Sequence, residues 1–202
     1  MNTSWLAAFF AALIWSAVSP HDYTTWVLEV FPALIAVVLL WWTRNTFPLT
    51  PLLYVLILMH SVILMVGGHY TYAEVPLFDW ISEVVGWQRN NYDKLGHFAQ
   101  GFVPAIVARE LLIRHTVIAR PGWLPFIIVS ICLAISAFYE LIEWWVAALS
   151  DDAAESFLGT QGYVWDTQSD MMLAMIGAIT AIVTLRRWHD RQLEGLRSSD
   201  AG

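Results

Sequence analysis

The stretch NYDKLGHFAQGF, residues 91–102, brings an acid, a base, an imidazole and a carboxamide to the start of an otherwise apolar helical run. Asp93, His97 and Gln100 are spaced i, i+4 and i+7, so a helix places them on one face. Ionisable groups inside a membrane helix are costly, and they usually face a bundle interior, a cavity or each other. The stretch therefore predicts a polar helix face with partners on other helices. The alternatives are a solvated helix entrance and, for Asp93, an ordinary N-cap.

The composition is that of a membrane protein. The chain is 58% apolar and holds 12 Trp among 202 residues, far from the usage of soluble proteins. Several windows of about 18 nearly uncharged residues are long enough to cross a hydrocarbon core of about 30 Å. The single cysteine, Cys132, excludes an intramolecular disulfide. We expect one integral membrane domain over residues 1–202, with membrane lipid as its partner and no nucleic acid.

The apolar runs predict an all-α, polytopic membrane bundle of six transmembrane helices. The second run closes on Trp41, Trp42 and Arg44, which form an aromatic belt followed by a cation. Residues 69–91 contain no spanning run and form an amphipathic connection, and connections of this length are usually functional. The expected helices cover residues 4–19, 23–42, 48–68, 93–114, 123–149 and 165–185.

The distribution of the cations predicts the orientation of the bundle. Six helices place both termini on one side, and that side holds eight of the ten Lys and Arg residues. The other side holds only Arg89 and Lys94. Because cytoplasmic loops of membrane proteins are enriched in Lys and Arg, we expect both termini to be cytoplasmic.

This topology gathers rare polar residues from four elements at one depth of the outer leaflet. Glu140 and Glu143 are i, i+3 neighbours near the end of the fifth helix, and Asp166 and Asp170 are i, i+4 neighbours at the start of the sixth. Six carboxylates at one level cannot all stay ionised and unpaired. Some must take protons, pair with nearby cations or share a bound ion. The six are Glu74, Asp93, Glu140, Glu143, Asp166 and Asp170.

One imidazole among carboxylate oxygens suits a divalent metal ion such as Zn, Mn or Mg. We therefore predict a metal site; the alternatives are a hydrogen-bonded structural network and a proton or ion pathway. The expected ligands are His97, Glu140, Glu143, Asp166 and Asp170. In the expected supporting set, His69 and Glu74 cap the site and Asp93 orients His97; the set is His69, Glu74, Asp93, Lys94, Gln100 and Gln161.

Such a site suits a metal-dependent hydrolase that acts on a lipid or a lipid-linked substrate. The ion would activate water, with Glu140 or Glu143 as the general base. The helices become apolar below the cluster, which favours a site open to one side. A proton-coupled or ion transporter is the alternative, with Glu29 and His60 as the only candidates for a relay, and a non-catalytic membrane assembly factor is the third hypothesis. The sequence leaves enzyme and transporter both open.

Four stretches of the chain resemble a known family in order and spacing. Residues 67–76, 89–101, 139–144 and 160–171 read GGHYTYAEVP, RNNYDKLGHFAQG, YELIEW and TQGYVWDTQSDM. They resemble the YjdF-like family of bacterial inner-membrane proteins, which implies a multi-pass location in the bacterial inner (plasma) membrane. That family has no established activity to carry over. A looser similarity to VanZ-like membrane proteins, which also open a helix with an Asp-Lys-x-x-His-type motif, implies glycopeptide or lipid-linked chemistry at the cell envelope.

Overall fold

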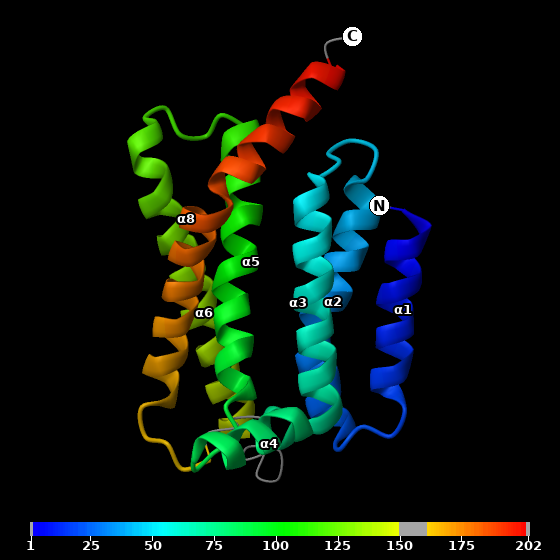
Figure 1. The fold of residues 1–202 in the computed structure, drawn as a ribbon, viewed down its shortest axis with the longest axis vertical. Coiled ribbons are helices and arrows are strands. Elements are labelled where there is room, and N and C mark those ends of the chain that lie inside the picture. The colour runs from blue at the N-terminus through cyan, green and yellow to red at the C-terminus, as the bar shows by residue number, and fades with distance from the viewer. Residues whose placement is uncertain (1, 150–160, 201–202) are drawn as a thin grey trace.

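Helix α5 stands between two groups of helices in the computed structural model of the chain (Figure 1). Helices α1, α2 and α3 form one group, and α6 and α8 lie on the other side of α5. The structure describes residues 2–149 and 161–200, and all the regular structure among them is helical. The long helices are α1 (Thr3–Ala17), α2 (Tyr23–Thr43), α3 (Pro51–Tyr70), α5 (Tyr92–Arg114), α6 (Leu124–Leu149) and α8 (Asp166–Asp200).

A short helix, α4 (Pro76–Val85), crosses one end of the bundle and connects the two groups (Figure 1). It follows a single 3-10 turn, Tyr72–Glu74, and begins with proline at its first position. It ends at Gly86, whose φ of +78° is the left-handed conformation that favours glycine at a helix end. The sequence predicted an amphipathic connection over residues 69–91, but it did not predict that a helix forms within it.

The tightest helix packing joins α5 to α8. A Cβ atom on Gly101 would lie 1.8 Å from the backbone oxygen of Ala174, and one on Gly177 would lie 2.2 Å from the oxygen of Phe98. Close backbone approach through small residues is typical of helix pairs in membranes. The two glycines therefore fix α8 against the helix that carries the polar stretch.

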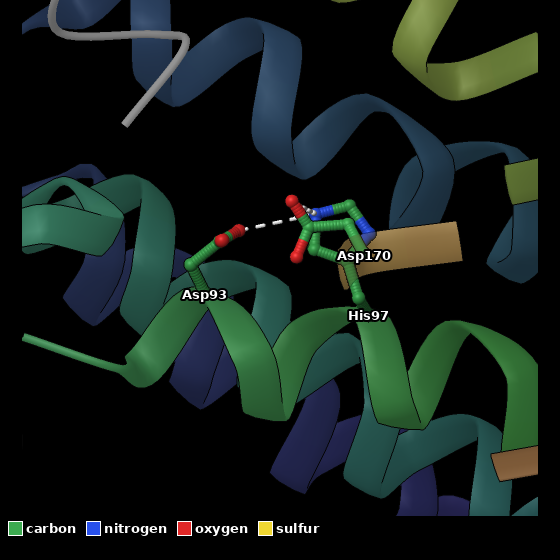
Figure 2. A group of neighbouring side chains, drawn as sticks. All are labelled: Asp93, His97 and Asp170. Carbon is green, nitrogen blue, oxygen red and sulfur yellow. Dashed lines mark ion pairs between the residues drawn. The ribbon is translucent and has the colours of Figure 1, made fainter. Parts of the chain in front are cut away.

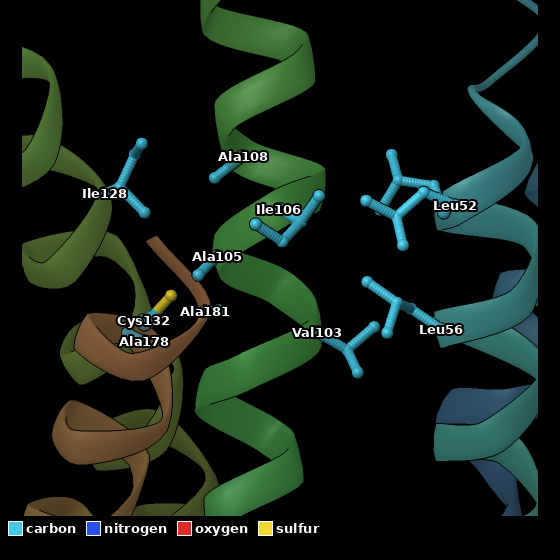
Figure 3. Close-up of a cluster of buried hydrophobic side chains, with 11 residues drawn as sticks. Leu52, Leu56, Val103, Ala105, Ile106, Ala108, Ile128, Cys132, Ala178 and Ala181 are labelled. Atoms are coloured by element: carbon cyan, nitrogen blue, oxygen red, sulfur yellow. The ribbon is translucent and has the colours of Figure 1, made fainter. Parts of the chain in front are cut away.

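The larger apolar core surrounds the other half of α5. In Figure 3, Leu52 and Leu56 of α3 lie on one side of α5, and Ile128 and Cys132 of α6 lie on the other. Cys132 is fully buried, as expected for a small core residue. This packing holds α5 beside α6 and α8, which its polar first turns also face.

Four helical segments are long and apolar enough to cross a membrane: Tyr23–Thr43, Pro51–Tyr70, Pro121–Leu149 and Asp166–Leu196. The expectation of six spans is therefore met in part. Helix α1 has 15 residues, fewer than the roughly 20 that a bilayer needs. Helix α5 has 23 residues and is long enough, but it carries five charged side chains and is less apolar than the four segments. The five are Asp93, Lys94, Arg109, Glu110 and Arg114.

Helix α8 continues well beyond residue 185, where the sequence predicted that the last helix would end. The reason is that the following turns are packed rather than solvated. His189 is fully buried, Leu193 is buried, and the side-chain oxygen of Gln192 accepts a hydrogen bond of 2.9 Å from the backbone N–H of Leu52. The described helix accordingly reaches Asp200.

Candidate functional site

Asp93, His97 and Asp170 form a buried cluster at the α4 end of the bundle (Figure 2). Asp93 and His97 are one turn apart on α5, and their side chains meet, with 3.1 Å between Oδ1 and Nε2. Asp170 comes from the first turns of α8, and its Oδ2 lies 3.9 Å from the same nitrogen. One ligand atom from each residue lies within 4.8 Å of the others. The i, i+4 spacing on α5 and the close α5–α8 packing produce this cluster.

The second nitrogen of His97 faces a different set of groups. Its Nδ1 lies 3.2 Å from the side-chain oxygen of Gln100, one turn further along α5. A proton on Nδ1 would be donated to that oxygen, which leaves the lone pair of Nε2 directed at Asp93 and Asp170. The i, i+4, i+7 spacing seen in the sequence thus gives His97 one partner on each side.

Glu140 of α6 completes the buried polar group. Its Oε1 lies 3.9 Å from His97 Nδ1, and the residue is 8% exposed. This oxygen has no hydrogen-bond partner among the described residues. A buried carboxylate oxygen without a partner is costly, so it indicates a ligand, a proton or a water at this position.

Asp166 lies beside this cluster rather than in it. Its Oδ1 accepts from Arg89 at 2.9 Å and from Lys94 Nζ at 2.8 Å. Lys94 also lies 2.6 Å from Asp170 Oδ1 and 3.4 Å from Asp93 Oδ2. Asp166, a predicted ligand, therefore lies outside the group of three ligand atoms, and two cations hold its carboxylate.

A cavity of about 200 Å³ borders the cluster and is lined by Asp93 and His97 themselves. Glu143 of α6 lines it, as do Glu29 of α2 and Tyr139, whose hydroxyl donates to Glu29 at 3.2 Å. His60 of α3 also lies on its wall. Glu143 therefore shares the cavity with His97 but lies outside the group of three ligand atoms, contrary to the predicted ligand set.

His69 and Glu74 do not cap the site. His69 Nδ1 lies 3.1 Å from the backbone oxygen of Ser16, and its ring packs against Trp15. Glu74 is exposed and forms an ion pair of 2.9 Å with His21. Both side chains turn towards the connection between α1 and α2, because the chain beyond α3 folds back on that side.

Tyr72 takes the capping position instead. Its ring lies between Gly67 and Gly96, where a Cβ atom on either glycine would come within 2.7 Å of the ring. Burial raises the pKa of the Tyr72 hydroxyl well above its usual value. The only sequence signal for this contact is the two glycines, and neither of them indicates Tyr72 as the residue that it contacts.

Gln161 binds the start of α5 rather than the cluster. Its side-chain oxygen accepts from the backbone N–H of Asn90 at 3.1 Å, and its amide donates to the backbone oxygen of Asn90 at 2.9 Å. The residue therefore ties the segment before α8 to the turn before α5. The sequence between α6 and α8 is acidic and contains glycine, and its residues 150–160 lie outside the described residues.

A second buried polar network, which sequence reasoning missed, occupies the opposite end of α5. Glu110 is fully buried and binds His189 of α8 at 3.0 Å and the hydroxyl of Thr50 at 2.8 Å. Arg109 contacts the other nitrogen of His189 at 2.8 Å, and Arg114 pairs with Glu110 at 2.9 Å. The signal that could have found it is the set of charges in the last turns of an otherwise apolar helix. Its members satisfy one another's hydrogen bonds and charges, so we interpret it as a network that stabilises the fold and call it the clamp.

The comparisons with known proteins agree with this picture. The chain is 52% identical over 193 residues to "Inner membrane protein YjdF" of Escherichia coli (strain K12), a match that covers 96% of this chain and 92% of the relative. No solved structure shows significant similarity to this chain. This relative and the apolar helices together show that the chain is a multi-pass inner-membrane protein. The relative also confirms the resemblance to the YjdF-like family. The family of predicted membrane proteins DUF2238 matches residues 1–191, and the chain belongs to that family.

Proposed function

We propose that this protein binds one divalent metal ion at Asp93, His97 and Asp170 and uses it to hydrolyse a lipid or lipid-linked envelope substrate. The observation that carries the proposal is the geometry of these three residues, whose ligand atoms come from two helices and lie within 4.8 Å of one another. Asp93 enters the ligand set in place of Asp166, which is held by Arg89 and Lys94.

The spacing of the ligand atoms supports an ion of zinc size. A tetrahedral site with bonds of about 2.0–2.2 Å separates its ligand atoms by roughly 3.3–3.6 Å. The distances of 3.1 Å and 3.9 Å from His97 Nε2 to the two carboxylates bracket that range. Three protein ligands leave a fourth position for water, which is the usual arrangement of a catalytic zinc site.

The surrounding residues supply the rest of a hydrolytic site. A bound ion would polarise a water molecule and the substrate oxygen. We assign Glu140 as the general base for that water, because its buried Oε1 lies 3.9 Å from His97 Nδ1 and has no hydrogen-bond partner among the described residues. Gln100 holds the ring of His97 in the orientation that directs Nε2 at the ion. Glu143 lines the cavity that would admit the substrate.

The proposal includes six membrane crossings with both termini in the cytoplasm. Figure 1 supports it, since successive long helices run in alternating directions and both termini lie at the end opposite α4. The charges of α5 do not oppose a crossing, because Arg109 and Glu110 are buried and paired within the bundle. The site then lies in the outer leaflet.

The test is metal analysis of protein purified in mild detergent without chelator. We expect about one equivalent of a divalent ion in the wild type and loss of it in His97→Ala, since His97 supplies the only nitrogen ligand. His115→Ala is the matched control, because His115 is exposed and stacks on Phe47 away from the cluster. A wild-type protein without bound ion, even after incubation with Zn²⁺ or Mn²⁺, would overturn the proposal.

One observation favours a proton-coupled transporter as the second candidate. Glu29 and His60 both line the cavity beside His97, and they are titratable groups from two further helices. Proton flux through purified protein in liposomes, abolished by Glu29→Gln and unaffected by His21→Ala at an exposed position outside both cavities, would establish that function. Absence of flux together with bound metal is the result that the hydrolase proposal expects.

A further inference from the structure

A second cavity, of about 650 Å³, continues from the first between α2, α3 and α5. The two cavities share four lining residues, Pro32, His60, Leu64 and Pro104. The shared residues include one proline from α2 and one from α5. Each proline removes a helical hydrogen bond and disturbs the packing of its own helix. The polar site therefore opens at its base into a larger space.

The larger cavity is apolar along its length. Its walls beyond His60 are formed mainly by aliphatic side chains, among them Ala36, Leu40, Ile57 and Val107. The polar lining residues lie at the two ends: His60 and Ser61 next to the smaller cavity, and Thr43, Thr46 and His115 at the far end. A volume of several hundred Å³ is typical of ligand sites, and this lining suits hydrocarbon rather than water or an ion.

The length of the cavity matches one lipid chain. From Pro32 to Thr43 is eleven residues along α2, which corresponds to about 16 Å at a rise of about 1.5 Å per residue. A single leaflet contributes about half of a hydrocarbon core of about 30 Å. The larger cavity therefore has the length of one ordinary acyl chain. Measured from the cluster, the two cavities together run along α5 from His97 to His115, about 27 Å, which fits the phosphate, the glycerol and one acyl chain of a phospholipid. This path is too short for a polyprenyl chain that exceeds the whole hydrocarbon core.

We propose that this cavity holds one acyl chain of a membrane phospholipid, with the phosphate-bearing end of the lipid at the Asp93–His97–Asp170 cluster. The placement of the phosphate rests on the proposed function, because carboxylates bind phosphate only through a shared cation. The placement of the chain rests on the shape and lining of the cavity alone. The substrate is then a phospholipid that enters between α2 and α5 and lies with its head at the site.

The experiment uses the full-length protein reconstituted with a phospholipid that carries a photoreactive diazirine in its acyl chain. After irradiation, mass spectrometry locates the labelled residues. We expect labels on the cavity walls of α2, α3 and α5, including Ala36 and Val107. Ala36→Trp should abolish these labels by filling the space. Val38→Trp on the same helix should keep them, because Val38 is 60% exposed and does not line the cavity.

The two proposals fail in different ways. His97→Ala should remove the metal and keep the labels in the cavity, whereas Ala36→Trp should remove the labels and keep the metal. The particle size and thermal unfolding of each variant in detergent show whether it is folded. If the Ala36→Trp variant does not fold, Ala36→Leu is the milder substitution that replaces it. Labels confined to outward-facing side chains such as Val38 and Phe126 would overturn the chain assignment. So would labelling of the cavity by a polyprenyl phosphate probe but not by the phospholipid.

Discussion

At the scale of single residues, the site depends on which groups face each of the two ring nitrogens of His97. Nε2 faces Asp93 and Asp170, and Nδ1 faces Gln100. Asp170 differs from its neighbour Asp166 in one respect that matters for metal binding. Asp170 presents one oxygen to His97 and the other to Lys94, whereas Asp166 meets only Arg89 and Lys94 among the described ion pairs.

The first prediction separates these two aspartates. Asp170→Asn should lower the affinity for Zn²⁺ by at least about tenfold, because it removes a direct ligand. Asp166→Asn should have a much smaller effect, since its carboxylate serves two cations instead. Isothermal titration of metal-free protein in detergent measures both affinities. Equal losses in the two variants would contradict the ligand set.

The second prediction concerns the orienting partner of the imidazole. Gln100→Leu keeps the volume of the side chain but removes the acceptor for Nδ1. Loss of such an outer partner costs about 10–100-fold in metal affinity. The same titration measures it, and Gln192→Leu, far from the site on α8, controls for removing a carboxamide.

At the scale of helices, the contact between α5 and α8 holds the two halves of the Asp93–His97–Asp170 cluster together. Asp93 and His97 are on one helix, Asp170 is on the other, and the backbones approach at Gly101 and Gly177. A change of this contact should therefore alter the stability and the site at once.

The third prediction tests this contact. Gly101→Ala would place a methyl group 1.8 Å from the oxygen of Ala174, so it should destabilise the fold by about 1–3 kcal/mol. Gly195→Ala on α8 meets nothing within 4 Å and should be neutral or slightly stabilising, as alanine favours helices. Thermal unfolding in detergent compares the two. A Gly101→Ala protein as stable as the wild type would show that the helices can move apart without cost.

The fourth prediction concerns the clamp at the far end of α5. Glu110→Ala leaves the buried His189 and the arginine Arg114 without their carboxylate partner, and breaking such a buried pair costs about 3–5 kcal/mol. Glu194→Ala, at an exposed position of α8, should change stability by less than about 0.5 kcal/mol. Metal content should stay unchanged in both, which separates the clamp from the site.

At the scale of the whole molecule, much of the arrangement follows from the sequence. The i, i+4 and i+3 spacings on three helices were enough to predict that His97, Glu140 and Asp170 meet. The partner of each carboxylate could not be predicted from the sequence, because Lys94 and Arg89 each lie within reach of more than one aspartate. It also misplaced His69 and Glu74, since their direction depends on how the chain turns after α3.

The fifth prediction concerns membrane topology. Reporter fusions at Gly202 and within residues 151–162 should give opposite sidedness, because an odd number of crossings separates the two points in a six-helix bundle. The alternating helix directions in Figure 1 agree with this expectation. Identical sidedness at the two points would remove one crossing and place the site on a different face.

The position of Lys94 has a consequence for how the site fills. Its ammonium lies within 3.4 Å of three aspartates, so the cluster carries a tethered countercharge of its own. Under the proposed function, an arriving divalent ion would not meet bare carboxylates, because it would have to displace this ammonium from Asp170. The ring of Tyr163 lies 5.7 Å from the same nitrogen and offers a π face to receive it. Loading of the site would then be a displacement in which the tethered ammonium moves aside and the bundle gains the full charge of the ion.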